Sequence, residues 1–124
     1  MKNQFLVMLT TGKKDEGTQA TLAFSCALSA ISLELDTFVF LTGEGSVWGL
    51  KGSSTGVVII GYPPLNNLIQ DYIHLGGKIL LCSVCYRDCN VSSFQQMNPL
   101  LDGVEIAGFA KAVSIAHSGS SITF

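Results

Sequence analysis

The chain has 124 residues, the size of one domain and enough to bury a hydrophobic core without stabilising disulfides. Only 13% of its residues are charged and 48% are hydrophobic, so a monomer's surface would be poorly solvated and we expect a homo-oligomer. The net charge of −2 and the few, scattered basic residues argue against a nucleic-acid-binding surface.

No apolar stretch is long enough to cross a membrane or to serve as a secretory signal. The longest, such as FVFL and VVIIGYPPL, are strand-sized or broken by proline, whereas a transmembrane helix needs about 18 to 20 residues. The first residues, MKNQFLVMLTTGKKDE, contain too short an apolar stretch for a signal peptide. We therefore expect a cytoplasmic protein, in which thiols stay reduced.

The N-terminal half alternates between strand-like and helix-like segments. Phe5–Leu9 predicts a strand, closed by the polar loop TTGKKDEG. Residues 18–35 lack Gly and Pro and are apolar on nearly every face, which predicts a helix buried between the sheet and a neighbouring subunit. Thr37–Leu41 predicts a buried parallel strand. A glycine-rich loop with at most one helical turn follows, and its Trp48 is either a local hydrophobic anchor or part of a site or subunit contact. GVVII, residues 56–60, predicts a short extended piece that need not belong to the main sheet.

The C-terminal half opens with the clearest periodic pattern of the chain. A helix over residues 64–75 with one buried face is predicted by apolar residues spaced i, i+3, i+4, i+7, i+8, namely Leu65, Leu68, Ile69, Tyr72 and Ile73. Lys78–Leu81 predicts a strand. Residues 92–103 predict a helical or turn-like stretch and residues 104–108 a strand. Residues 109–116 predict a helix and residues 121–124 an edge strand. This alternation predicts a three-layer α/β/α fold with a mainly parallel sheet of about five strands, in one domain over residues 1–124.

Three of the four cysteines lie in the segment GGKILLCSVCYRDCN, residues 76–90. Cys82 follows the predicted strand, and in parallel sheets the functional crevice lies at the carboxyl ends of the strands. If SVCYRDC begins a helix, the backbone N–H groups that follow Cys82, those of Ser83 and Val84 first, favour its thiolate form. Arg87 would add positive charge beside the sulfur. The segment therefore predicts a reactive thiol.

The spacing of the three sulfurs allows more than one kind of chemistry. Cys82 and Cys85 form a Cys-x-x-Cys pair, in which a first thiolate attacks and a second resolves the mixed disulfide or persulfide. Cys89 lies four residues after Cys85, on the same helical face. Metal binding would need four ligands, and no second Cys-x-x-Cys or histidine pair occurs in the chain, so we predict no metal and no other cofactor.

The remaining candidate residues favour structural roles. Cys26 lies inside a predicted helix and is interpreted as a small core residue. His74 and His117 stand alone, and the order and spacing of the polar residues give no Ser-His-Asp triad. The segment GEGSVWG matches neither a phosphate-binding loop nor a dinucleotide-binding fingerprint.

In the order of these landmarks the chain resembles the DsrE/DsrF-like family of small α/β proteins, which includes sulfur-relay subunits. The resemblance covers most of the chain and lies in DTFVFLTGEGSVWGLKG, in GYPPLNNLIQDYIHLGGKILLCSVCYRDCNV, and in LDGVEIAGFAKAV followed by SITF. It implies that Cys82 carries sulfur as a persulfide, received from a donor protein and passed to an acceptor protein. It also implies that Cys85 matches the second cysteine of one branch, that Arg87 matches a basic residue of that branch, and that the protein is a homotrimer or a hexamer of trimers.

The chain departs from the family at the end of the cysteine segment. Asn90 stands where glycine is usual, and Asp88 and Cys89 stand where a small and a basic residue are more frequent. These changes bear on the partner surface and on the local pKa of the thiols rather than on the fold. We predict a sulfur carrier or sulfurtransferase-like protein with its persulfide at Cys82. The alternatives are a non-catalytic oligomeric binding module and a Cys-x-x-Cys dithiol redox protein.

Overall fold

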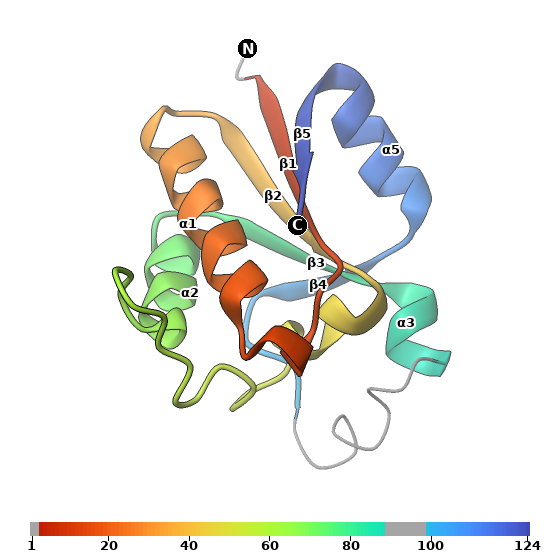
Figure 1. Cartoon of the computed structure of the whole chain (residues 1–124). Coiled ribbons are helices and arrows are strands. Elements are labelled where there is room, and N and C mark those ends of the chain that lie inside the picture. Colours follow the sequence, from red (N-terminus) through yellow and green to blue (C-terminus); the bar gives the residue numbers. More distant parts are fainter. Residues whose placement is uncertain (1–2, 89–98) are drawn as a thin grey trace.

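Five parallel strands form one sheet in the order β4-β3-β2-β1-β5 in a computed structural model that describes residues 3–88 and 99–124. The strands are β1 (Gln4–Leu9), β2 (Asp36–Leu41), β3 (Lys78–Cys82), β4 (Val104–Ala107) and β5 (Gly119–Thr123). The helices are α1 (Thr18–Ser32), α2 (Leu65–His74), α3 (Ser83–Asp88) and α5 (Phe109–Ser118), and two 3-10 segments are η1 (Lys13–Asp15) and η2 (Gly43–Gly49). Helices α1 and α2 cover one face of the sheet and α5 covers the other, so the predicted three-layer α/β/α fold is confirmed (Figure 1).

The helices predicted over residues 18–35, 64–75 and 109–116 are present, with ends that differ from the prediction by one to three residues. Helix α2 begins after Pro64 and buries the predicted apolar face. Helix α1 ends at Ser32, three residues before the predicted end, because Glu34 adopts the left-handed conformation with φ 63° and the Leu35 N–H bonds back to the Ala30 carbonyl. This turn closes a helix as a glycine usually does, and no glycine marks it in the sequence.

Strands β1, β2 and β3 are buried on both faces, as their continuous apolar sequences predict. Alternate residues of β1, β2 and β3 pack against α1 and α2 in a larger cluster of the core: Val7, Leu9, Val39, Leu41, Ile79 and Leu81. The residues between them form a smaller cluster with α5: Leu6, Phe38, Phe40, Leu80 and Cys82, joined by Cys85, Ala112 and Ile115. The side chain of Cys82 therefore lies on the face that α5 covers.

The short extended piece predicted at residues 56–60 does not join the sheet, and β5 is an edge strand, as predicted. The prediction for residues 92–103 falls largely outside the described residues, as do Cys89 and Asn90. In the part that is described, Leu100 makes an isolated antiparallel bridge with Leu50.

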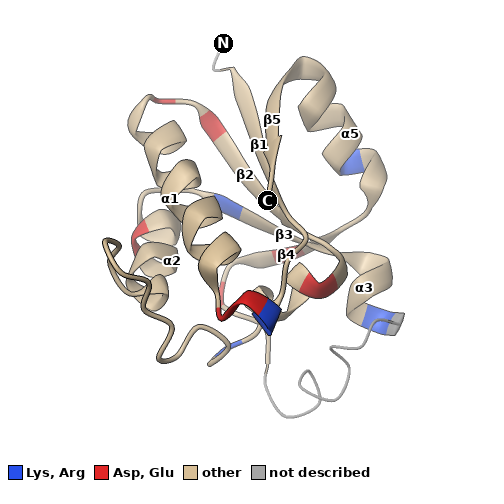
Figure 2. Ribbon diagram, in the orientation of Figure 1, with Lys and Arg blue, Asp and Glu red and all other residues tan. Residues whose placement is uncertain are grey.

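Charged side chains are dispersed over several elements rather than gathered on one face (Figure 2). The salt bridges of the described residues are surface pairs between neighbouring elements, such as Lys51 with Asp102 at 3.5 Å. Within residues 3–88 and 99–124, no helix is long and apolar enough to span a membrane.

Candidate functional site

The candidate site lies where the neighbouring strands β2 and β3 end. Cys82 is the last residue of β3, and α3 begins at the next residue, Ser83. Beside it, β2 ends at Leu41 and continues through Thr42 into η2. Because β2 and β3 are hydrogen-bonded neighbours in the sheet, these two strand ends bring residues from distant parts of the chain together. The junction of β3 and α3 thus lies at the carboxyl edge of the sheet, as the sequence predicts.

Cys82 is deeply buried, with 1% of its surface exposed. It pairs in register with Ala107 of β4 and lies in the core cluster that α5 covers. In the part of the chain that the structure describes, no hydrogen bond reaches its sulfur, and Cys82 and Cys85 are separate thiols rather than a disulfide. The surroundings of Cys82 are therefore apolar and shielded from water.

Cys85, in α3, has polar neighbours. The backbone N–H of Gly43 donates a hydrogen bond to its sulfur at 3.1 Å, and the Thr42 hydroxyl lies 3.7 Å from the same atom. Gly43 turns the chain with φ 57°, a left-handed conformation that favours glycine. Cys85 is 7% exposed. The structure thus gives the second thiol of the pair, rather than the first, its polar hydrogen-bond partners.

Thr42 and Gly43 were not singled out by the sequence as contacts of a cysteine. Their contact could have been predicted from the Thr-Gly pair directly after a buried strand, but only if β2 and β3 were known to be neighbours in the sheet. The adjacency is a property of the whole sheet, because Gly43 and Cys85 are 42 residues apart in the chain.

The other residues predicted around Cys82 lie on the short helix α3. Ser83 is half-buried, Val84 is 49% exposed, and Arg87 is exposed in the last turn. The first backbone N–H groups of a helix lack partners within that helix. Because their side chains are exposed, Val84 and Arg87 form the rim of the junction between β3 and α3.

Trp48 is placed differently from a residue that would contact a ligand. Its ring is completely buried, and its indole N–H donates a hydrogen bond of 2.9 Å to the Thr11 carbonyl. The Lys13 ammonium lies 5.8 Å from the ring centroid. These contacts attach η2 to the loop that follows β1, which corresponds to the anchor interpretation of Trp48.

Cys26 lies on α1, outside the site. It is partly buried against the larger core cluster, and this burial raises the pKa of its thiol. Among residues 3–88 and 99–124, no group of three or more His, Cys, Asp or Glu side chains is arranged to hold a metal ion.

The chain is similar to a known protein family over almost its whole length. The model of the DsrE/DsrF-like family matches residues 4–124, almost the whole chain. The chain belongs to this family.

Two known proteins are similar to this DsrE/DsrF-like chain, one in structure and one in sequence. The crystal structure of the ychN protein from E. coli matches with a TM-score of 0.75 and 19% sequence identity over the full length of both chains, which shows the shared fold. An uncharacterised protein of Methanocaldococcus jannaschii is 28% identical over 108 residues. That alignment covers 86% of this chain and only 37% of the relative, so the chain spans little more than a third of that relative's length.

Proposed function

We propose that this protein is a cytoplasmic sulfur carrier that holds a persulfide at Cys82, with Cys85 as the assisting thiol. The observation that carries the proposal is the position of Cys82 as the last residue of β3, directly before α3, with a second thiol three residues later. In such a transfer, a cysteine thiolate attacks the outer sulfur of a donor persulfide. The bond between the two donor sulfurs breaks and the electron pair leaves with the donor thiolate, so no external oxidant is needed.

Partner proteins would dock at the exposed rim of this junction. Val84 offers an apolar contact and Arg87 a positive charge, while the amides of Ser83 and Val84 lie in the first turn of α3. A donor protein and an acceptor protein would use this rim in turn, because a relay needs both to approach the same thiols.

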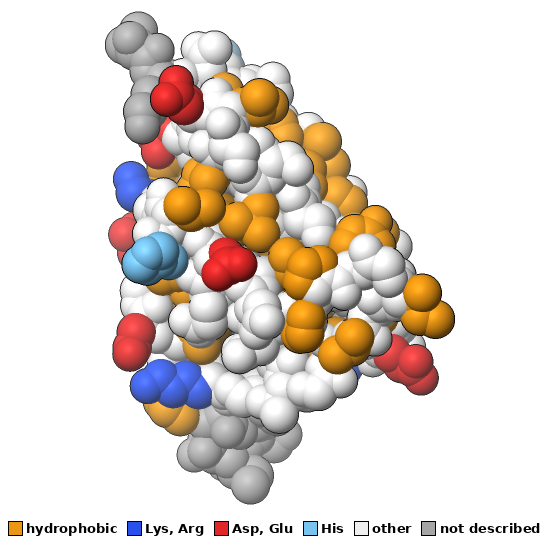
Figure 3. Space-filling view, turned by 90° about the vertical axis from the view of Figure 1, so that its left-hand side faces the viewer, with side chains coloured by type: hydrophobic (Ala, Val, Ile, Leu, Met, Phe, Trp, Pro, Cys, Tyr) orange, Lys and Arg blue, Asp and Glu red, His pale blue; other side chains and the backbone are white. Residues whose placement is uncertain are grey.

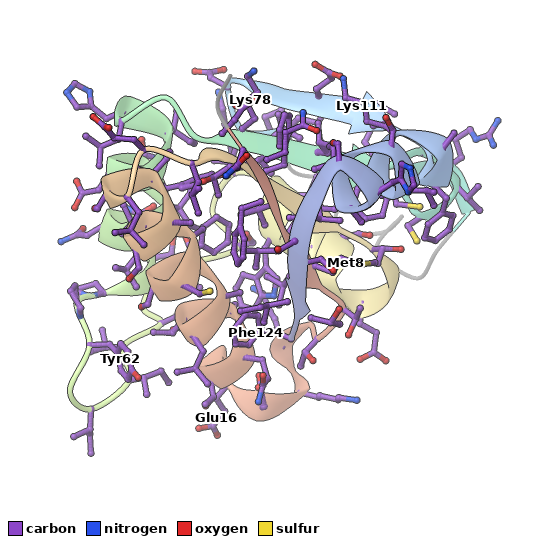
Figure 4. All side chains as sticks on the ribbon, turned by 90° about the horizontal axis from the view of Figure 1, so that it is seen from above. Met8, Glu16, Tyr62, Lys78, Lys111 and Phe124 are labelled. Carbon is purple, nitrogen blue, oxygen red and sulfur yellow. The ribbon has the colours of Figure 1, made fainter. Side chains whose placement is uncertain are left out.

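Self-association of the chain is the second part of the proposal. The loop between η2 and α2 exposes apolar side chains: Val58, Ile60 and Tyr62. Figure 3 shows apolar side chains gathered along one side of the molecule. Figures 1 and 4 place this loop, marked by Tyr62 in Figure 4, on the opposite side of the molecule from α3. A homotrimer or hexamer that buries the loop would leave the junction of β3 and α3 uncovered for partners.

Mass spectrometry after incubation with a persulfide donor tests the carrier function. The reduced protein should gain one sulfur atom on the peptide that contains Cys82. The variant Cys82→Ser should lose the stable adduct, and the matched control Cys26→Ser should keep it, because Cys26 lies on α1 away from the junction. A Cys82→Ser protein that still holds the sulfur as long as the wild type would contradict the assignment.

A dithiol redox protein is the second candidate, favoured by the presence of both thiols in one core cluster. It would form a Cys82–Cys85 disulfide on oxidation, with a reduction potential within the range of cytosolic couples. A wild-type protein that forms this disulfide with any donor, and never carries an additional sulfur atom, would favour this candidate over the carrier.

A further inference from the structure

The two thiols of the junction have different surroundings. The sulfur of Cys85 faces the corner formed by Thr42 and Gly43, with the Gly43 N–H at 3.1 Å and the Thr42 hydroxyl at 3.7 Å. An N–H···O bond typically measures about 2.9–3.0 Å, and sulfur is the larger atom, so the Gly43 amide contacts the sulfur closely. The amide can only donate, and donors of this kind stabilise an acceptor most when it carries negative charge.

Cys82 has the opposite environment. Its sulfur lies among apolar side chains such as Phe40 and Leu80, and its exposed fraction of 1% is smaller than the 7% of Cys85. This environment suits a group that must be kept from water and from unwanted thiols. The environment of Cys85 suits a group that must be an anion when it reacts.

We propose that Cys85 is the thiol that takes up sulfur and Cys82 the thiol that stores it. Thr42 and Gly43 are positioning residues that hold the sulfur of Cys85 as an anion between transfers. The inference rests on the proposed carrier function and adds to it an order of events and the two residues that impose this order.

The order consists of two balanced transfers. First, the Cys85 thiolate attacks the outer sulfur of the donor persulfide. The donor S–S bond breaks, the donor leaves as a thiol with the proton of the outer sulfur, and Cys85 becomes an anionic persulfide. Second, the Cys82 thiol gives its proton to this outer sulfur, the resulting Cys82 thiolate attacks the same sulfur, and the S–S bond to Cys85 breaks with its electron pair left on Cys85. The products are a Cys82 persulfide and the Cys85 thiolate, and no oxidant or reductant is consumed.

The second transfer returns the negative charge to Cys85, where the two donors lie. The hydrogen bonds from Gly43 and Thr42 therefore favour the state in which Cys82 holds the sulfur and Cys85 is ready for another donor. The hydrogen bonds of Thr42 and Gly43 to Cys85 thus explain both fast uptake of sulfur at Cys85 and its storage at Cys82.

Charged groups on the elements around α3 do not reverse this preference. The carboxylates on η2 and β4 and the ammonium group on β3 are each within salt-bridge distance of an opposite charge: Glu44 with Lys14 at 3.8 Å, Glu105 with Lys111 at 4.0 Å, and Lys78 with Asp36 at 4.0 Å. Arg87 is the cation on α3 itself.

The test compares Thr42→Val with Thr42→Ser. Valine has nearly the shape of threonine and lacks the hydroxyl, whereas serine keeps it. The probe is glutathione persulfide, and the rate of sulfur uptake is followed by mass spectrometry on the peptide of residues 79–87, whose fragment ions separate Cys82 from Cys85. Because a hydrogen bond to a charged group is lost, uptake by Thr42→Val should be about 10-fold slower, and Thr42→Ser should react at close to the wild-type rate.

Two cysteine variants locate the sulfur. In Cys82→Ala, the sulfur should arrive on Cys85 and should be lost from it sooner than the wild type loses it from Cys82. In Cys85→Ala, loading of Cys82 should be slower by 10-fold or more. If wild type loads Cys82 and Cys85→Ala loads it equally fast, the proposed order is wrong and the carrier function stands. If the wild type takes up no sulfur, the carrier function and the order both fail.

A second measurement does not depend on the persulfide. Alkylation of Cys85 by iodoacetamide, measured against pH on the same peptide, should shift to higher pH in Thr42→Val and return to the wild-type profile in Thr42→Ser. Circular dichroism checks that both variants are folded. Identical profiles for folded Thr42→Val and wild type would refute the positioning role of Thr42, whatever the result with persulfide.

Discussion

Replacement of Tyr72 by phenylalanine should destabilise the fold at the amino-terminal ends of β2 and β3. Tyr72 lies in α2 and is completely buried. Its hydroxyl donates to the carbonyls of Lys78 at 2.7 Å and of Thr37 at 3.1 Å, which connects α2 to the starts of β3 and β2. Phenylalanine keeps the ring, including its edge-on contact with Phe24 at 5.8 Å between centroids, and removes only these bonds.

The size of the effect follows from the single hydroxyl proton, which the two carbonyls share. Removing a buried donor and leaving its acceptors without it costs about 1–3 kcal/mol, so the free energy of unfolding should fall by about this amount. For a domain of this size, each kcal/mol changes Tm by about 3–6 °C. The matched control is Tyr62→Phe, on the exposed loop before α2, which should change stability by less than about 0.5 kcal/mol.

The same residue gives a pH dependence with a definite sign. Burial raises the pKa of Tyr72 far above its ordinary value, and the negative charge of Asp36 adds to this effect. The native state therefore keeps the phenol proton at a pH where the unfolded chain, with an ordinary tyrosine pKa of about 10, releases it. The stability that Tyr72 contributes is complete below pH ~10, and it decreases above it by up to about 1.4 kcal/mol per pH unit.

Urea denaturation followed by circular dichroism at several pH values between 8 and 11 measures both effects. The wild type should exceed Tyr72→Phe in stability at pH 8, and this difference should shrink as the pH rises above 10. Titration of the other tyrosines and of the lysines affects both proteins alike and cancels in the difference. Equal stability at pH 8, or a difference that does not change up to pH 11, would refute the reasoning.

Two further substitutions test the segment beside the site and the exposed loop. In Gly45→Ala the added Cβ would clash with the carbonyl oxygen of Leu9 and lie 2.7 Å from the carbonyl carbon. Urea denaturation should therefore show a free energy of unfolding lower by about 1–3 kcal/mol. The control Gly108→Ala should show almost no loss, because the nearest atom to its added Cβ is 3.8 Å away. A Gly45→Ala protein as stable as Gly108→Ala would show that η2 does not press on the end of β1. Ile60→Asp, at a position 99% exposed, should leave the fold intact and reduce the mass measured by light scattering, while Val113→Asp on α5 serves as the control on another face. An unchanged mass for Ile60→Asp would exclude this loop from the subunit interface.

Local patterns were sufficient to predict the strands, α2 and the position of Cys82. Continuous apolar runs mark parallel strands buried on both faces, and the spacing from Leu65 to Ile73 marks a one-sided helix. The end of α1 could not be predicted, because it depends on Glu34, a residue type that seldom adopts a left-handed turn.

The segment after β2 shows that glycine content alone does not indicate exposure to solvent. Its glycines predict a loop, yet Gly45–Gly49 are all buried. Gly45 lies so close to the end of β1 that no side chain fits, so here glycine allows close approach to the sheet rather than flexibility. The contact of Thr42 and Gly43 with Cys85 could not be predicted either, because it depends on which strands are neighbours.

The two faces of the sheet are unequally covered, and this bears on how a buried thiol is reached. Helix α5 buries only Ala112 and Ile115, and every residue of β5 is exposed, whereas α1 and α2 bury a much larger cluster. Regions with few buried contacts open locally at a lower free energy than the rest of a protein. Helix α5 and β5 should therefore detach transiently while β1, β2 and β3 stay paired. Cys82 lies beneath the α5 side of the sheet, so its sulfur can be deeply buried on average and still be reached through brief openings of the least stable part of the molecule.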